Sequence, residues 1–208
     1  MAVVLTIAQQ KGGAGKTTLA AHLGAVFAAT RRVALLDIDP QKSLARWFAL
    51  RGGAKAACAL DLADVSGWRL GGELARLGRS VDLIIIDSPP QIATDARVAM
   101  RAADLVLVPI QPSPPDLWAA EGTLALAAAE GRAARLVFNR APAASRLRQA
   151  MAEEIAERGL GLLTQSLGSR SAFASAFARG LGVTEAAPRS RAALELRALA
   201  DEIIGVVT

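Results

Sequence analysis

The sequence predicts an α/β fold, a doubly wound and mainly parallel sheet with helices on both faces. Three observations support this prediction. Short, continuously apolar runs alternate with segments of helical periodicity along the chain, which is typical of parallel strands buried on both faces. A glycine-rich turn joins the first apolar run to the first helical segment. No linker, repeat or low-complexity tract interrupts the 208 residues, so residues 1–208 are expected to form a single domain.

The expected strands are the apolar runs, taken in chain order. They lie at Val3–Ala8, Val33–Asp37, Leu83–Asp87, Leu105–Ile110 and Leu136–Asn139, with weaker candidates at Ala56–Leu60 and Leu160–Leu163. Helical periodicity fills the intervals between them. The expected helices are Thr17–Ala29, Ser43–Leu50, Trp68–Leu77, Asp95–Ala102, Leu117–Glu130, Ser145–Arg158, Ser171–Arg179 and Ser190–Val207. Because ligands bind at the carboxyl ends of strands in such a sheet, polar residues that follow strands are the first candidates for function.

Composition narrows the class of protein. Hydrophobic residues make up 52% of the chain and charged residues 21%, which is typical of a globular protein. No apolar run reaches the roughly 18 residues that a membrane span needs, and residues 2–8 lack the basic segment and cleavage site of a signal peptide. The single cysteine, Cys58, excludes an internal disulfide and a multi-cysteine metal cluster within one chain. Together these features predict a cytoplasmic protein without a membrane partner.

The positive charge is concentrated late in the chain. The net charge is +5, but the stretch from Arg132 to Arg191 alone contains ten arginines against four acidic residues. A basic segment on an otherwise neutral body suits a polyanionic partner. A solvated, arginine-rich surface explains the same pattern equally well.

A phosphate-binding loop is the strongest motif. The run Gln10–Thr18 follows the apolar residues Val3–Ile7 and opens the helical pattern Leu19–Leu23. Glycines let backbone N–H groups point at phosphate oxygens, and the helix N-terminus adds free donors and a positive dipole end. Lys16 is expected to neutralise charge on the β- and γ-phosphates, and the Thr17 hydroxyl is expected to ligate Mg²⁺.

Three carboxylates come just after expected strands. Asp37 and Asp39 follow the second strand, and Asp87 ends the apolar run at 83–87. An aspartate at the end of an apolar strand beside a phosphate loop is typical of a residue that holds Mg²⁺, usually through water. A lone aspartate after a strand would more often be a helix cap or a turn residue. The presence of the loop favours the metal role for Asp87.

The loop departs from the common G-x-x-x-x-G-K-[ST] pattern. Gln10 stands where that pattern has glycine, and a second lysine, Lys11, begins the loop. This form, K-G-G-x-G-K-[ST]-T, resembles the deviant loop of the ParA/MinD family of ATPases, and the segments D-x-D-P-Q from Asp37 and D-x-P-P from Asp87 resemble that family too. The resemblance implies a P-loop ATPase that hydrolyses ATP with Mg²⁺. It covers residues 2–140 well and residues 141–208 only in general layout.

The resemblance also implies residue roles. In the family the second aspartate of D-x-D-P-Q, here Asp39, orients or activates the attacking water, because Mg²⁺ and lysines stabilise charge without positioning the nucleophile. The first aspartate lies near the metal and the loop. The expected metal ligands are therefore Thr17, Asp37 and Asp87, and the expected catalytic residues are Lys11, Lys16 and Asp39. The expected nucleotide-binding residues are Lys11, Gly12, Gly13, Ala14, Gly15, Lys16, Thr17, Thr18 and Asn139.

Lys11 is the residue through which the resemblance implies dimerisation. In the family this lysine crosses to the ATP phosphates of a second subunit, as an arginine finger does. ATP then adds contacts that only the dimer has, so it shifts the equilibrium toward the dimer. The segment Pro109–Asp116 resembles the family segment that helps form this dimer, and Asn139 corresponds to the asparagine that contacts adenine. A solvated loop lysine is the alternative for Lys11.

Several relatives with this loop are disfavoured. Members that bind an iron–sulfur cluster need paired cysteines, but the chain has one cysteine. The related bacterial tyrosine kinases need a tyrosine cluster, but the chain has no tyrosine. The last helix has Leu196, Leu199, Ile203 and Val206 at helical spacing, with Glu195, Asp201 and Glu202 on its polar face. An acidic face would be repelled by anionic lipid, so this helix is expected to pack on the sheet. With no helix-turn-helix segment before the first strand, the chain most resembles the small ParA/ParF-type partition ATPases.

The predicted function is ATP-driven partitioning or positioning of a plasmid, a chromosome or another large cargo. The resemblance implies an ATP-dependent homodimer that binds DNA without sequence preference, associates with the nucleoid, and hydrolyses ATP when a ParB-like or other adaptor stimulates it. The arginines expected as candidate phosphate contacts are Arg146, Arg148, Arg170, Arg179, Arg189 and Arg191. Two alternatives stay open: a biosynthetic enzyme similar to dethiobiotin synthetase or cobyrinic-acid amidase, and a nucleotide switch with negligible turnover.

Overall fold

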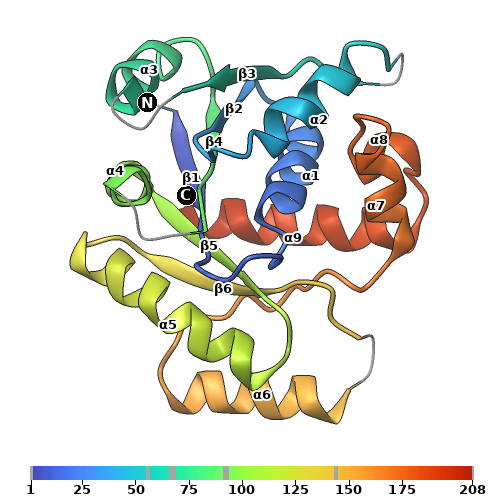
Figure 1. The fold of residues 1–208 in the computed structure, drawn as a ribbon. Coiled ribbons are helices and arrows are strands. Elements are labelled where there is room, and N and C mark those ends of the chain that lie inside the picture. Colours follow the sequence, from blue (N-terminus) through green and yellow to red (C-terminus); the bar gives the residue numbers. More distant parts are fainter. Residues whose placement is uncertain (1, 55–56, 66–68, 91–93, 143–144, 208) are drawn as a thin grey trace.

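The computed structural model describes residues 2–54, 57–65, 69–90, 94–142 and 145–207. These residues form a six-stranded sheet in the order β3-β2-β4-β1-β5-β6 (Figure 1). Every strand pair is parallel. The strands are β1 Val3–Ile7, β2 Val33–Asp37, β3 Asp61–Asp64, β4 Leu83–Asp87, β5 Leu105–Ile110 and β6 Ala134–Phe138. The predicted parallel sheet is confirmed.

Helices cover both faces of this sheet, as the sequence predicts. They are α1 Lys16–Ala28, α2 Ser43–Arg51, α3 Leu70–Leu77, α4 Thr94–Ala102, α5 Pro114–Ala129, α6 Arg146–Glu157, α7 Ser171–Phe177, α8 Val183–Ala186 and α9 Arg191–Val207. In Figure 1, α3, α4 and α5 lie on one side of the sheet, and α1, α2, α7 and α8 lie on the other. Alternate residues of the central strands supply each layer. Leu35 and Ile85 pack with α1 and α9, whereas Leu36 and Ile86 pack with α3 and α4.

Two weak strand predictions differ from the structure. Edge strand β3 lies at Asp61–Asp64, not at Ala56–Leu60, whose first residue lies outside the described residues. An edge strand needs backbone pairing more than continuous apolar character. Leu62 and Ala63 pair with β2 and face opposite core layers, while the flanking aspartates are exposed. The segment Leu160–Leu163 makes a single parallel bridge, between Leu136 and Leu162, rather than a strand.

The helix predictions are confirmed with small shifts at their ends. The exceptions are α8, a four-residue helix that the sequence analysis missed, and the start of the expected helix Trp68–Leu77, because Trp68 lies outside the described residues. One turn of helix is too short to give a periodic signal. Its position is fixed instead by packing, since Val183 is fully buried beside α1.

The last helix, α9, packs one face against the core. Leu196, Leu199 and Ile203 of α9 are completely buried in the core layer that α1 and α7 share. Val206 is 39% exposed, so the expected apolar stripe ends one turn earlier than its spacing suggests. Within the described residues, no helix is long and apolar enough to span a bilayer.

Candidate functional site

The central strands bring the predicted residues to one edge of the sheet. In the parallel register, Ile7 at the end of β1 and Asp37 at the end of β2 both pair with Asp87 at the end of β4. The phosphate loop follows β1 directly, and Asp39 follows β2. The carboxyl ends of three adjacent strands therefore place the loop and the three predicted carboxylates side by side, where an open parallel sheet binds ligands.

The loop has the backbone shape of a phosphate cradle. Gly13 and Gly15 adopt the left-handed conformation, with φ of 80° and 90°, which favours glycine. A Cβ on Gly15 would lie 2.5 Å from Asn139 Nδ2, so a side chain there would be strained by the backbone conformation and would also require the Asn139 side chain to shift. Among the described residues, no acceptor takes a hydrogen bond from the N–H groups of residues 13–17. These donors lie at and just before the N-terminus of α1, where a phosphate can accept hydrogen bonds from them.

Gln10 fits its unusual position because of a glycine far along the chain. Its side chain lies against Gly122 of α5, where a Cβ would collide with it. The absence of a side chain at Gly122 therefore leaves room for the Gln10 amide in this position. This pairing could not be recognised from the loop motif alone.

Lys16 begins α1 and is 7% exposed. Burial lowers the pKa of its ammonium group, and the nearby carboxylates Asp87 and Asp39 oppose that shift. A buried cation beside two carboxylates and a set of free N–H donors is well placed to neutralise phosphate charge.

Asp87 is a fully buried carboxylate whose two oxygens lack hydrogen-bond partners of acceptable geometry in the described structure. Burial raises the pKa of this carboxyl to about 7, and the Thr17 hydroxyl and the Lys16 charge oppose the shift only in part. A buried carboxylate without donors is costly unless a cation binds it. Asp87 and Thr17 therefore fit a Mg²⁺ ion, whose remaining ligands would be phosphate and water.

Asp37 has a different environment. It is completely buried, and its two oxygens accept hydrogen bonds from the backbone N–H groups of Asp39 (3.1 Å) and Ala45 (2.9 Å). Burial raises the pKa of Asp37, and these two hydrogen bonds lower it in part. The visible role of Asp37 is to hold the turn between β2 and α2 in shape. Its predicted role as a metal ligand remains a prediction.

Asp39 lies on that turn and is 9% exposed. Its Oδ1 accepts a hydrogen bond from the backbone N–H of Gln41 (2.9 Å). Lys42, in the left-handed conformation at φ 53°, ends the turn, and its Nζ lies 2.5 Å from Asp64 on β3. The turn is thus fixed at both ends. The other carboxylate oxygen of Asp39 has no protein partner within the described structure, and such a free oxygen suits a residue that positions water.

Lys11 contacts a carboxylate of its own chain. Its Nζ lies 2.5 Å from Oδ2 of Asp116, which also accepts a hydrogen bond from the Ser113 hydroxyl (2.7 Å). Burial alone would raise the pKa of Asp116, but the hydrogen bonds from Lys11 and Ser113 outweigh it and lower that pKa. The Lys11 side chain stays 40% exposed. The predicted contact with a second subunit is untested, and within one chain Asp116 holds the lysine.

Asn139 lies at the side of the loop. Its Nδ2 donates to the carbonyl oxygen of Ala14 (2.9 Å), and Arg140 Nη1 donates to that of Gly13 (3.3 Å). Next to Asn139 is a cavity of about 420 Å³ between α1 and α7, lined by Thr18, Leu19, Arg140, Phe173 and other residues of the segment 167–178. The position suits a base beside the phosphate loop, but the adenine contact of Asn139 remains a prediction.

Sequence analysis missed His22, the only histidine, which lines this cavity. It is buried on α1, where its Nδ1 accepts from the N–H of Val183 (3.0 Å) and its Nε2 lies 3.2 Å from the carbonyl oxygen of Phe173. Because Nδ1 accepts, Nε2 carries the proton. Burial lowers the pKa of His22 to about 4, so the ring is neutral. A single histidine on the apolar face of a helix gives no sequence signal that it will connect α1 to Val183 and Phe173 by hydrogen bonds.

The six candidate DNA-contacting arginines are only partly brought together. Arg148, Arg170 and Arg191 line one small cavity of about 200 Å³ beside Glu195. Arg170 is paired with Glu195 at 2.5 Å, and Arg191 lies 3.6 Å from the same carboxylate. Arg146, Arg179 and Arg189 do not line that cavity. Of the six predicted phosphate contacts, Arg148, Arg170 and Arg191 therefore lie together, and the other three lie outside this cluster.

Comparison with known proteins gives a family and several relatives. Residues 5–183 match the family described as the CobQ/CobB/MinD/ParA nucleotide binding domain. The maintenance of carboxysome distribution protein A of Halothiobacillus neapolitanus is 30% identical over 213 residues, which span 98% of this chain and 97% of that protein. The sporulation initiation inhibitor protein Soj of Bacillus subtilis is 29% identical over 149 residues, 53% of this chain and 59% of that protein.

Solved structures share the fold at low identity. An ATP complex of a McdA variant from Cyanothece superimposes with a TM-score of 0.81 and 20% identity, over 98% of this chain and 96% of that one. The cell division ATPase MinD of Pyrococcus furiosus gives 0.79 and 22%, over 99% and 100%. Cobyrinic acid a,c-diamide synthase of Mycobacterium smegmatis, bound to ADP and magnesium, gives 0.77 and 21%, over 98% and 94%.

Proposed function

Because the chain belongs to the CobQ/CobB/MinD/ParA nucleotide-binding family and is an ATPase of the ParA/MinD type, we propose that it positions a large cellular cargo by cycling between ATP-dependent dimers and monomers. The observation that carries the proposal is the full-length similarity to a carboxysome distribution protein, which spans 98% of this chain and 97% of that relative. A plasmid, a chromosome or a protein assembly could each be the cargo.

The proposed site divides the chemistry among four residues. Lys16 and the N–H groups of the loop bind the phosphates, Thr17 and Asp87 hold Mg²⁺, and Asp39 positions the attacking water. Mg²⁺ would supply the charge that the developing phosphate anion needs. The orphaned oxygens of Asp87 support this division, because a bound cation would satisfy them.

Dimerisation is proposed to depend on Lys11. It must leave Asp116 to reach phosphates of a second subunit, and its 40% exposure leaves it accessible. An ammonium group supplied across an interface stabilises the dimer only when a nucleotide is present. ATP hydrolysis then removes the contact and resets the cycle.

Nonspecific DNA is the proposed surface on which the dimers act. The net charge of +5 and the cluster of Arg148, Arg170 and Arg191 support a polyanionic partner. Contacts to the DNA backbone release counterions, so binding should fall steeply as salt rises. A ParB-like or other adaptor attached to the cargo is proposed to stimulate hydrolysis, which would release the dimers.

A biosynthetic activity is the second candidate. The fold similarity to cobyrinic acid a,c-diamide synthase favours it, since the same sheet and loop serve small-molecule chemistry there. The D-x-D-P-Q and P-S-P-P-D segments favour the positioning ATPase. ATP turnover that responds to DNA and an adaptor would support positioning, and turnover that responds to a small carboxylic acid would support biosynthesis.

The test is binding of unrelated duplex DNA with ATP, with ADP and without nucleotide, across a salt series, with Lys16→Ala as the control that cannot use ATP. We expect binding only with ATP, with a steep loss between low and high salt. Binding of equal strength in all three states, or none in any, would contradict the proposed cycle while leaving the ATPase assignment intact.

A further inference from the structure

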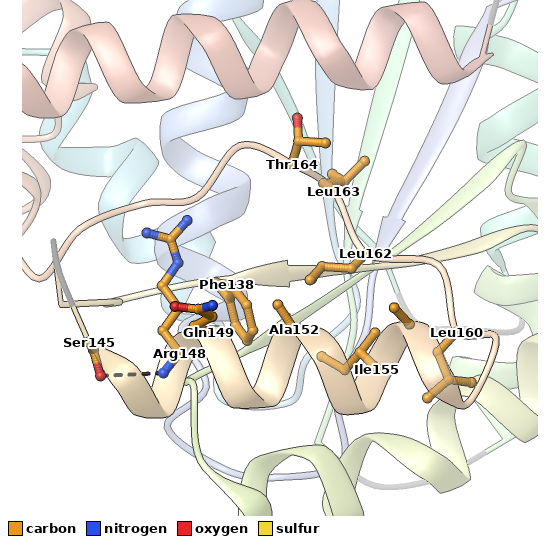
Figure 2. A pocket seen from close by; sticks show the side chains of 11 residues that line it. Phe138, Ser145, Arg148, Gln149, Ala152, Ile155, Leu160, Leu162, Leu163 and Thr164 are labelled. Carbon is orange, nitrogen blue, oxygen red and sulfur yellow. Dashed lines mark hydrogen bonds between the residues drawn. The ribbon is translucent and has the colours of Figure 1, made fainter.

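A hollow lies along α6, and no phosphate-loop residue lines it (Figure 2). Its volume is about 550 Å³, in the range of ligand-binding clefts. Helix α6 forms one wall, the segment 160–164 forms the other, and the end of β6 forms the floor. We name it the α6 groove. Its accessible apolar surface comes from Ala152, Leu160 and Leu162, which are partly buried, and beneath it lie Phe138 and Ile155, which are 2% and 0% exposed.

Among the described residues, Arg148 is the one charged side chain that lines the α6 groove. Its guanidinium carbon lies 5.9 Å from the centre of the Phe138 ring, and Figure 2 shows the side chain rising from α6 beside Phe138. No carboxylate of the described residues pairs with it. Two other arginines near it are paired, since Arg158 lies 2.6 Å from Glu121 and Arg170 lies 2.5 Å from Glu195. The groove therefore presents an unneutralised cation beside an apolar surface.

We propose that the α6 groove binds a short peptide segment of a partner protein, with a large apolar side chain in the groove and a neighbouring carboxylate on Arg148. The apolar walls favour burial of a side chain such as leucine or phenylalanine, and an unpaired guanidinium favours a carboxylate in a bidentate contact. The groove is partly open to solvent rather than fully enclosed, which suits a chain that crosses it better than a small ligand that must be buried.

The α6 groove and the cavity beside the phosphate loop are lined by adjacent residues of the chain. Phe138, at its floor, precedes Asn139, whose side chain donates to the loop carbonyl of Ala14. The carbonyl oxygen of Phe138 also accepts from the N–H of Leu167, which lines the cavity beside the loop. Phe138 is 2% exposed beneath the groove, so an occupant that displaces it would also displace Asn139 and Leu167, two residues that line that cavity. This coupling rests on the proposed ATPase cycle, whereas the binding itself does not.

The experiment measures fluorescence anisotropy of labelled synthetic decapeptides on the full chain without nucleotide. Two peptides share the same leucine and phenylalanine residues, and one has glutamate and aspartate where the other has lysine. We expect saturable binding of the acidic peptide only. Arg148→Glu should weaken it by about tenfold or more, because a charge-assisted hydrogen bond is lost. Arg146→Glu, the matched control, changes the same charge on an exposed residue of α6 outside the groove and should bind normally.

A second pair of variants tests the apolar contact. Ala152→Trp should fill the α6 groove and abolish binding, whereas Leu147→Trp, on a residue that is 50% exposed and outside the groove, should leave it unchanged. Thermal melts of each variant separate a blocked groove from an unfolded protein. Absence of saturable binding, or equal effects of each test variant and its control, would overturn the proposal. Binding of octanoate without binding of the acidic peptide would also overturn it in favour of a small amphipathic acid.

The coupling has its own readout, the rate of ATP hydrolysis with and without saturating acidic peptide. A change of rate that Ala152→Trp removes would support coupling to the nucleotide site. An unchanged rate with intact peptide binding would contradict the coupling alone. A failure of ATP-dependent DNA binding would contradict the proposed function without touching the peptide result.

Discussion

At the scale of single residues, the two loop lysines have different surroundings. Lys16 is 7% exposed at the start of α1, whereas the Lys11 side chain is 40% exposed and contacts Asp116. The buried lysine can serve only its own subunit's nucleotide. The exposed one can exchange an internal carboxylate for a phosphate on a second subunit.

This difference predicts separable defects. Lys16→Ala should lose ATP binding, because the cation nearest the phosphates is removed. Lys11→Ala should still bind ATP with about the same affinity but should lose ATP-dependent dimerisation and stimulated hydrolysis. Nucleotide titration and light scattering with ATP measure the two properties. Normal dimerisation of Lys11→Ala would rule out the role of this lysine across the interface.

His22 predicts a pH-dependent stability. Its pKa is about 4 in the folded protein against an ordinary value of 6.5, because burial disfavours the charged ring. Below pH 6.5 the unfolded chain binds a proton that the folded chain does not, so stability falls as pH falls from 6.5 toward 4. The shift corresponds to about 3 kcal/mol at most. Above pH 6.5 the contribution of His22 is complete and constant.

Urea unfolding at a series of pH values between about 7.5 and about 4.5 measures this loss. His22→Gln is the control, since glutamine can still accept from Val183 and donate to Phe173 without titrating. The nearby Glu185 charge, which opposes the shift, is present in both proteins. Equal pH slopes for both would exclude His22 as the source.

At the scale of elements, the join between β1 and α1 depends on backbone shape. Gly15 has φ 90° and lies so close to Asn139 that a Cβ would be 2.5 Å from its Nδ2. Gly131, after α5, has φ 67° with nothing within 4 Å of a Cβ. The two glycines share the left-handed conformation and differ in their surroundings.

Alanine at each position separates conformation from contact. Gly131→Ala should cost about 1–2 kcal/mol of unfolding free energy from its left-handed backbone alone and should keep ATP binding. Gly15→Ala should cost more, because Asn139 must move, and should lose ATP binding. Denaturant titrations and nucleotide titrations of both variants provide the comparison. Equal costs with ATP binding retained would contradict the close approach of Asn139.

At the scale of the whole molecule, the question is what resets the dimer. If hydrolysis does, a protein that binds ATP without hydrolysing it should stay dimeric. Asp39 is the proposed water-positioning residue. Its Oδ1 accepts a hydrogen bond from the N–H of Gln41, and its charge acts on Lys16.

Asp39→Ala should therefore bind ATP, form a long-lived dimer and remain bound to DNA, with turnover reduced by about 100-fold or more. Light scattering with ATP over time, beside the wild-type protein, measures dimer lifetime. A variant that turns over ATP normally would remove Asp39 from the mechanism. A variant that is inactive yet monomeric would separate dimerisation from ATP binding.

The features that local chemistry encodes could be predicted from the amino-acid sequence. The loop Gln10–Thr18, the apolar strands β1, β2, β4, β5 and β6, and the family resemblance all rest on contiguous residues, and the fold and the family are confirmed. Glycine spacing and strand-end aspartates are signals of short range, because neighbours in sequence set the backbone shape that phosphate binding requires. These signals needed no knowledge of packing.

Contacts between residues that are distant in sequence could not be predicted and are seen only in the folded structure. Lys11 meets Asp116, Asn139 meets Ala14 and His22 meets Val183 across separations of 105, 125 and 161 residues. The edge strand β3, the short helix α8 and the α6 groove likewise depend on how elements pack. Burial and register belong to the assembled sheet, since a side chain's environment is made by elements that are close in space and not in sequence.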